Sequence, residues 1–198
     1  ILGVVNYGVY DVVGGVVVLF TLISGPLSAS TSRFLTFEIG TQNKRRLNEV
    51  LSVSMLIHLG FALLVCLLTE TIGLWFVLNV LVIPPERMDA ALWVLHFSVV
   101  SIFFSIVQTP LRADVISHER MDAFAAISLM EIFLRLIFVL LLAYVSFDLL
   151  ITYAAMLALI SILSFAAYWR FCRLKFEEAQ GPRFYSRGVA KDLLSFMG

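Results

Sequence analysis

Residues 123–147 read AFAAISLMEIFLRLIFVLLLAYVSF, and Glu131 and Arg135 are the only charged residues among them. A helix needs about 20 apolar residues to cross the hydrocarbon core of a bilayer. Inside lipid, a helix also satisfies all of its own backbone polar groups. Four further stretches have the same character, at 10–32, 48–68 (48–83 in a longer form), 90–109 and 149–169. The sequence therefore predicts an all-α, polytopic membrane helix bundle with about five transmembrane helices.

The composition agrees with a membrane protein. Hydrophobic residues make up 61% of the chain and charged residues 14%, whereas soluble domains average about 45–50% and about 25%. The net charge is zero, so there is no global positive field that would attract nucleic acid. The lipid bilayer is the expected partner, and no nucleic-acid partner is expected.

The basic residues are distributed unevenly between the predicted loops. Twelve of the fourteen Lys and Arg residues lie in or beside alternate loops, namely Arg33, Lys44, Arg45, Arg46, Arg112, Arg120 and the six that follow residue 169. Cytoplasmic loops are enriched in Lys and Arg, so these loops are predicted to lie inside the cell. We expect residues 1–170 to form the transmembrane bundle and 171–198 a cytoplasmic amphipathic linker toward a second bundle. Because the chain opens without an initiator methionine, we expect a fragment of a longer membrane protein.

The third predicted span carries a row of polar residues. Ser98, Ser101, Ser105 and Gln108 recur at helical spacing, and Arg112 follows four residues later, so all five share one helix face. This pattern fits the wall of a water-filled cavity, and it equally fits hydrogen bonding between packed helices. Pro110 is predicted to bend or end this helix before an inner loop.

The charged pair in the fourth span is expensive to place in lipid. Each charge near mid-depth costs about 2.5–3.5 kcal/mol on insertion scales, so such charges face the bundle interior and pair. Glu131 precedes Arg135 by four residues, which is the favourable order for a helical ion pair. Two interpretations stay open: a structural pair that neutralises itself, or a switchable pair facing a central cavity.

The sequence contains no signature of catalysis or cofactor binding. G-x-S-x-G, P-loop, G-x-G-x-x-G and H-E-x-x-H patterns are absent, so we expect no enzyme activity and no cofactor. The three histidines, His58, His96 and His118, are not spaced as metal ligands, so no metal site is predicted.

Three short motifs keep a fixed order relative to the predicted spans. They are Leu2-Gly3-Val4-Val5-Asn6-Tyr7-Gly8-Val9-Tyr10, then Ser32-Arg33-Phe34, then Pro110-Leu111-Arg112-Ala113 with His118-Glu119-Arg120-Met121 and Phe124-Ala125. In this order the chain resembles bacterial polysaccharide flippases of the multidrug/oligosaccharidyl-lipid/polysaccharide exporter superfamily, over essentially its whole length. It departs from their pattern at Arg112, where asparagine is commoner.

The resemblance implies two helical bundles around a central cavity that work by alternating access. The implied substrate is an undecaprenyl-diphosphate-linked oligosaccharide such as an O-antigen or lipopolysaccharide precursor, moved from the inner to the outer leaflet of the bacterial inner membrane. Arg33, Arg112 and Arg135 are the candidate anion contacts, because guanidinium groups match phosphate oxygens. Glu131 would hold Arg135 when the cavity is empty, and Ser98, Ser101, Ser105 and Gln108 would complete the binding surface.

Two rival functions remain at the level of sequence. An ion-coupled multidrug efflux transporter of the same superfamily would need acidic residues in the cavity, and only Asp11, near the outer boundary, fits that requirement. A membrane scaffold without transport activity would use the polar rows for helix packing alone.

Overall fold

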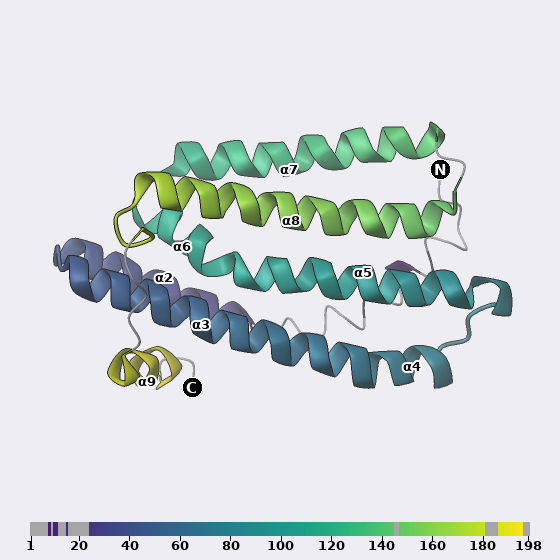
Figure 1. Cartoon of the computed structure of the whole chain (residues 1–198), viewed down its shortest axis with the longest axis horizontal. Coiled ribbons are helices and arrows are strands. Elements are labelled where there is room, and N and C mark those ends of the chain that lie inside the picture. The colour runs from purple at the N-terminus through teal and green to yellow at the C-terminus, as the bar shows by residue number, and fades with distance from the viewer. Residues whose placement is uncertain are drawn as a thin grey trace.

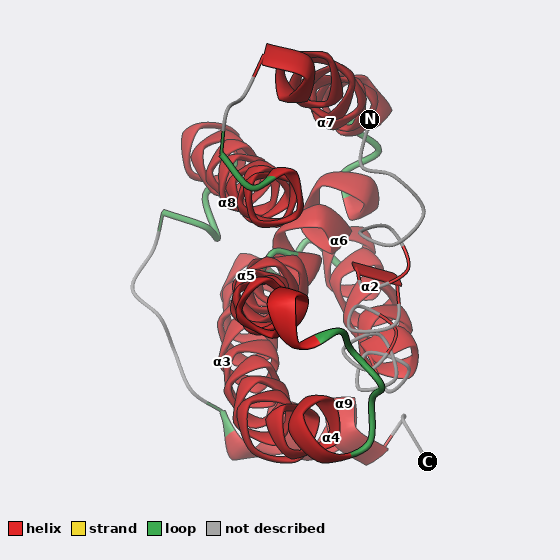
Figure 2. Cartoon of the chain, turned by 90° about the vertical axis from the view of Figure 1, so that its right-hand side faces the viewer, coloured by secondary structure: helices red, strands yellow, loops and turns green. Residues whose placement is uncertain are grey.

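A computed structural model describes residues 8, 10, 11, 15, 24–144, 147–180 and 186–195. The described chain contains helices and no strand, so the fold is an all-α bundle (Figures 1 and 2). Its α-helices are α2 (Ser24–Gly40), α3 (Lys44–Leu68), α4 (Leu74–Asn79), α5 (Met88–Val107), α6 (Thr109–Ser117), α7 (Met121–Leu141), α8 (Leu149–Lys175) and α9 (Arg187–Ser195). Short helical turns of other types lie at Thr69–Gly73, Pro85–Arg87 and Leu142–Tyr144.

Four helical stretches are long and apolar enough to cross a membrane: Lys44–Asn79, Pro85–Ser117, Met121–Tyr144 and Leu149–Lys175. They coincide with four of the five predicted spans, and the chain is a multi-pass membrane protein. Eleven of the 23 positions of the first predicted span, 10–32, lie outside the described residues. Its last part forms the beginning of α2.

The second span matches the longer of its two predicted forms. A π-helical turn at Thr69–Gly73 connects α3 directly to α4, so the helical stretch continues to Asn79. Thr69 donates its hydroxyl to the Val65 carbonyl at 2.8 Å, which satisfies this buried side chain within the helix.

The third span breaks where proline was expected to act. Helix α5 ends at Val107, and α6 begins at Thr109 with Pro110 in its first turn. The prediction of a loop after Pro110 is wrong, because the chain continues as helix as far as Ser117. Proline fits the first turn of a helix, where its missing N–H would have no intrahelical partner.

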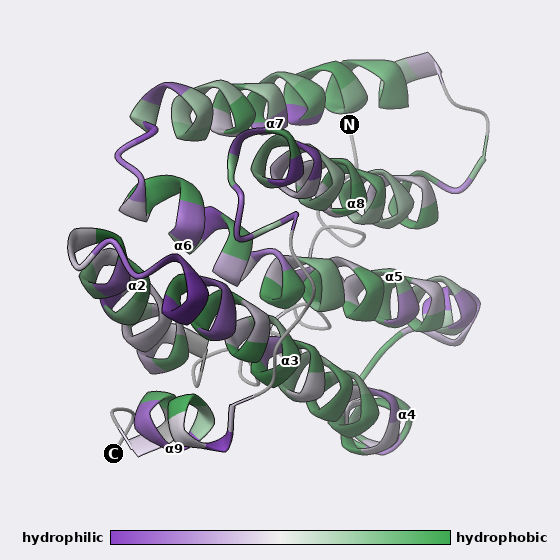
Figure 3. Ribbon diagram, turned by 60° about the vertical axis from the view of Figure 1, so that its left-hand side comes forward, coloured by the Kyte–Doolittle hydropathy of each residue, from purple (hydrophilic) through white to green (hydrophobic). Residues whose placement is uncertain are grey.

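The helices differ in how far they are enclosed by the bundle. Helix α8 packs most extensively against α5, and α5 also packs against α3. Helix α7 packs mainly against α8 at the edge of the bundle (Figures 1 and 2) and is the least buried of the four spans. Its side chains are nevertheless largely apolar (Figure 3). In a membrane, this exposed surface suits acyl chains or another hydrophobic helix.

Salt bridges gather where the α2–α3 turn, the α6–α7 turn and the end of α8 meet, which we call the basic end. Lys44 pairs with Glu177 at 2.7 Å. Arg46 lies 3.5 Å from Glu38 and 3.6 Å from Asp192. Several basic residues that were predicted to share one side of the membrane therefore meet at one end of the bundle.

Helix α9 packs on the basic end through its apolar side. Val189 and Leu193 are buried in a cluster with residues of α2 and α3, including Leu35 and Leu47. The Ser30 hydroxyl on α2 donates to the Leu193 carbonyl at 3.0 Å. The amphipathic character predicted for 171–198 thus serves contact with protein in α9. Phe184 and Phe196 of this segment lie outside the described residues.

The opposite end of the bundle is fixed by one carboxylate. Asp148 caps α8 by accepting from the backbone N–H groups of Leu150 at 2.9 Å and Ile151 at 3.3 Å. It also pairs with Arg87, which lies in the short helical turn before α5. The chain between α4 and α5 is thereby connected to the start of α8.

Replacing Asp148 with alanine is expected to lower the free energy of unfolding by about 1–2 kcal/mol, because it removes a helix cap worth about 1 kcal/mol and a partly exposed ion pair worth about 0–1 kcal/mol. Asp148→Asn keeps an acceptor for the helix cap and loses only the ion pair. It should therefore lower the free energy of unfolding about as much as Arg87→Ala does. Denaturant unfolding in detergent micelles measures the three variants. An alanine variant as stable as the asparagine variant would show that the cap contributes nothing.

Candidate functional site

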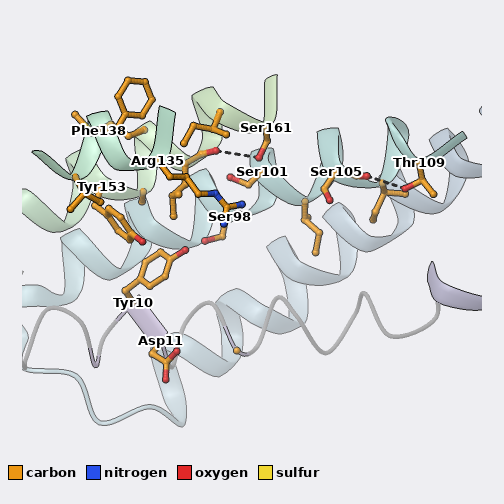
Figure 4. A pocket seen from close by; sticks show the side chains of 18 residues that line it. Tyr10, Asp11, Ser98, Ser101, Ser105, Thr109, Arg135, Phe138, Tyr153 and Ser161 are labelled. Atoms are coloured by element: carbon orange, nitrogen blue, oxygen red, sulfur yellow. Dashed lines mark hydrogen bonds between the residues drawn. The ribbon is translucent and has the colours of Figure 1, made fainter. Parts of the chain in front are cut away.

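A half-enclosed cavity of about 710 Å³ lies between α5, α7 and α8, and residues near Tyr10 also contribute to it (Figure 4). Its polar lining comes from all three of these helices and from the α5–α6 junction. The polar side chains that line it are Tyr10, Asp11, Ser98, Ser101, Ser105, Thr109, Arg135, Tyr153 and Ser161. Polar groups are costly to retain at membrane depth, so this cavity is the candidate functional site.

The serine row on α5 forms one long wall of this cavity. Ser98, Ser101 and Ser105 all line it, and Thr109 continues the row onto α6. The Ser101 hydroxyl donates to the Phe97 carbonyl at 3.0 Å, and that of Thr109 donates to the Ser105 carbonyl at 3.1 Å. Each hydroxyl oxygen keeps lone pairs that can accept from a ligand. At 1.5 Å per residue the row extends over about 17 Å, roughly half the hydrocarbon thickness.

The guanidinium of Arg135 is the basic group of the cavity. Figure 4 shows its side chain reaching from α7 toward the serines of α5. Among the residues that the structure describes, none forms an ion pair with Arg135. An unpaired charge in a membrane span needs water or an anion beside it. Arg135 therefore equips this cavity to bind a negatively charged group.

The predicted ion pair between Glu131 and Arg135 does not form. Glu131 instead accepts a hydrogen bond from the hydroxyl of Ser164, a buried residue of α8. Within the described part of the chain, Glu131 is not among the residues that line the cavity. The predicted pair is absent because the α7 face that carries Glu131 packs on α8, where the Ser164 hydroxyl donates to the Glu131 carboxylate. Glu131 thus connects α7 to α8.

Three other predicted site residues lie away from the cavity. The Arg112 guanidinium sits 5.6 Å from the ring centre of Phe124, in cation–π contact. Gln108 closes the end of α5, and its side-chain oxygen is buried without a hydrogen-bond partner. Arg33 is exposed on α2. The structure therefore brings together Ser98, Ser101, Ser105 and Arg135, and it leaves Arg33, Gln108, Arg112 and Glu131 outside their cavity.

Sequence reasoning missed the contribution of α8. Tyr153, Leu157 and Ser161 line the cavity at intervals of four residues, which is helical spacing. Tyr153 also makes an edge-to-face contact with Tyr10, with ring centres 5.1 Å apart. These residues do recur at helical spacing in the sequence. With only two polar side chains, however, the row looks the same as an ordinary helix-packing face.

No protein-family model, curated protein or solved structure matches this chain. The resemblance to polysaccharide flippases therefore stays a prediction.

Proposed function

We propose that this chain is part of a flippase that carries an undecaprenyl-diphosphate-linked oligosaccharide from the inner to the outer leaflet of the bacterial inner membrane by alternating access. The observation that carries the proposal is the unpaired Arg135 guanidinium in a cavity lined with hydroxyl groups. A diphosphate and its sugars cannot cross about 30 Å of hydrocarbon without such a polar path. The prenyl tail would remain in the bilayer.

The Arg135 guanidinium favours an anionic head group. Guanidinium binds phosphate through paired, charge-assisted hydrogen bonds. The serine hydroxyls of α5 both donate and accept, so they suit sugar hydroxyls as well as phosphate oxygens. Tyr10 and Tyr153 add aromatic surface at one end of the cavity (Figure 4), against which the apolar face of a sugar can pack.

The cavity has the size of a small-molecule site, and its location suits a lipid-linked cargo. Its volume of about 710 Å³ lies in the range of about 300–1,000 Å³ that is usual for small-molecule sites. The cavity borders α7, the span that is least enclosed by the bundle. A lipid-linked substrate needs such a neighbouring apolar surface, because its tail stays among acyl chains while its head group is bound.

One observation favours the alternative of cation efflux. Asp11 lines the same cavity as Arg135, and an organic cation would require a carboxylate there. Among the described residues, no ion pair joins Asp11 to Arg135, and Figure 4 shows the two side chains apart. The cavity therefore carries both signs of charge, and a binding experiment must distinguish which one selects the ligand.

Equilibrium binding of two probes to the full chain in lipid nanodiscs tests the proposal. Farnesyl diphosphate represents the lipid diphosphate, and tetraphenylphosphonium represents a hydrophobic cation. We expect saturable binding of farnesyl diphosphate that weakens in Arg135→Ala and persists in Asp11→Asn. Binding of tetraphenylphosphonium alone, lost in Asp11→Asn, would overturn the proposal in favour of efflux. Binding of neither probe would also overturn it.

A further inference from the structure

A second polar cluster lies at the basic end, apart from the cavity. Asp114 of α6 and His118 at the end of that helix meet Glu178, which follows α8. One potential ligand atom from each residue lies within 4.8 Å of the other two. Asp114 and His118 are one helical turn apart, whereas Glu178 is distant in sequence, so the fold itself brings the third side chain to the cluster.

The hydrogen bonding of His118 leaves one ring nitrogen directed at a carboxylate. Its Nδ1 lies 3.0 Å from the backbone carbonyl oxygen of Asp114; because a carbonyl only accepts, Nδ1 carries the hydrogen. Its Nε2 lies 3.1 Å from Oε1 of Glu178. In neutral imidazole facing an ionised Glu178 this would place two lone pairs against each other, so either a proton or a metal ion must satisfy both atoms. The Phe176 ring, stacked on the imidazole at 4.0 Å, holds its plane.

The buried carboxylate of Asp114 also lacks a positively charged partner in the described part of the chain. Its side chain is 0% exposed, and neither carboxylate oxygen has a hydrogen-bond partner. Oδ1 lies 3.4 Å from Nδ1 of His118, whose hydrogen serves the backbone carbonyl. Among the described residues, no Lys or Arg pairs with Asp114 or Glu178. A buried carboxylate without partners is costly, so it must be neutralised by a proton or by a bound cation.

We propose that Asp114, His118 and Glu178 bind one divalent transition-metal ion of the Zn²⁺ class. One imidazole nitrogen with two carboxylate oxygens suits Zn²⁺, whereas Mg²⁺ and Ca²⁺ prefer oxygen ligands alone. Tetrahedral ligand atoms around zinc lie about 3.3 Å apart, so side-chain movements on the order of 1 Å complete the site. The Nδ1–H bond to a backbone carbonyl is the outer contact that metal-bound histidines usually make.

The ion would join three parts of the bundle. His118 lies at the α6–α7 turn, and Glu178 lies beyond α8. The Glu178 backbone carbonyl accepts from the Asn48 side chain of α3 at 2.9 Å. A bound metal would therefore fix the basic ends of α3, α6 and α8 relative to one another.

Calorimetric titration of Zn²⁺ into the full chain in detergent micelles tests the site. We expect one Zn²⁺ per chain. Asp114→Asn and Glu178→Gln should each lower the affinity by about a hundredfold, since even outer contacts of a metal site are worth about 10–100-fold. Glu177→Gln changes the exposed neighbour of Glu178, and His96→Asn changes a histidine paired with Glu70 in the outer part of the bundle. Both control variants should bind as the parent does.

Circular dichroism of each variant confirms that the helices are retained before the titrations are compared. Absence of stoichiometric Zn²⁺ binding by the folded parent chain would overturn the proposal, because the cluster would then hold a proton alone. Equal affinity of Asp114→Asn, Glu178→Gln and the control variants would overturn it as well. The measurement is independent of the transport proposal, because it uses neither the cavity nor a transport assay.

Discussion

Replacing Arg135 with alanine is expected to reduce surface polysaccharide export at least about tenfold in cells that depend on the full-length protein. A hydrogen bond to a charged group is worth about 1.5–3 kcal/mol, and a guanidinium binds a diphosphate through more than one. Lipid-linked precursor should accumulate in the inner leaflet of the membrane. Immunodetection of surface polysaccharide and chromatography of the lipid fraction measure the two effects.

Two matched variants separate binding from folding. Arg135→Lys keeps the charge but loses the paired geometry of the guanidinium, so intermediate export is expected. Glu131→Gln keeps an acceptor for the Ser164 hydroxyl and lies away from the cavity, so normal export is expected. Normal export by an Arg135→Ala protein that inserts at parental levels would contradict the proposed anion site.

Replacing Ala158 with leucine is expected to lower the free energy of unfolding by about 1–3 kcal/mol, the usual cost of overpacking a core. Ala154 and Ala158 are buried one helical turn apart on α8, and α5 is the main partner of this helix. Small residues allow close approach of membrane helices, which gain little from hydrophobic burial in lipid. A leucine side chain at this buried position would force α8 away from the helices packed on it.

Ala166→Leu is the matched control, because Ala166 is exposed on the same helix and added apolar surface there can face lipid. Denaturation in mixed micelles, followed by loss of helical circular dichroism, measures both variants. Equal stability of the two variants would show that α8 does not pack tightly at Ala158.

The sequence predicted the spans because length and apolar composition dominate the behaviour of a helix in lipid. Residues 90–109 and 149–169 are close to α5 (Met88–Val107) and α8 (Leu149–Lys175). Helix α6 was missed because Pro110 was interpreted as a stop, although proline also favours the first turn of a new helix. Local sequence does not decide between these two outcomes.

The cavity was predictable only in part. Ser98, Ser101 and Ser105 were recognisable by their helical spacing. Arg135 was recognisable by the free-energy cost of a charge inside a membrane span. The structure brings all four residues together. The partner of Glu131 was not predictable, because Ser164 becomes its neighbour only when α7 packs on α8. The cluster of Asp114, His118 and Glu178 depends on tertiary contact in the same way, and no metal spacing in the sequence reveals it.

The central claim is that the serine row of α5 and Arg135 line a cavity that water reaches. Reaction of single cysteines with a membrane-impermeant thiol reagent tests it, in a background with Cys66 and Cys172 replaced by alanine. Ser101→Cys is expected to react at least about tenfold faster than Ile132→Cys, which lies on the exposed apolar surface of α7, because thiols react as thiolates that form only in contact with water. The claim would be contradicted if Ser101→Cys and Ile132→Cys were both unreactive while Glu86→Cys, in the short helical turn before α5, reacted.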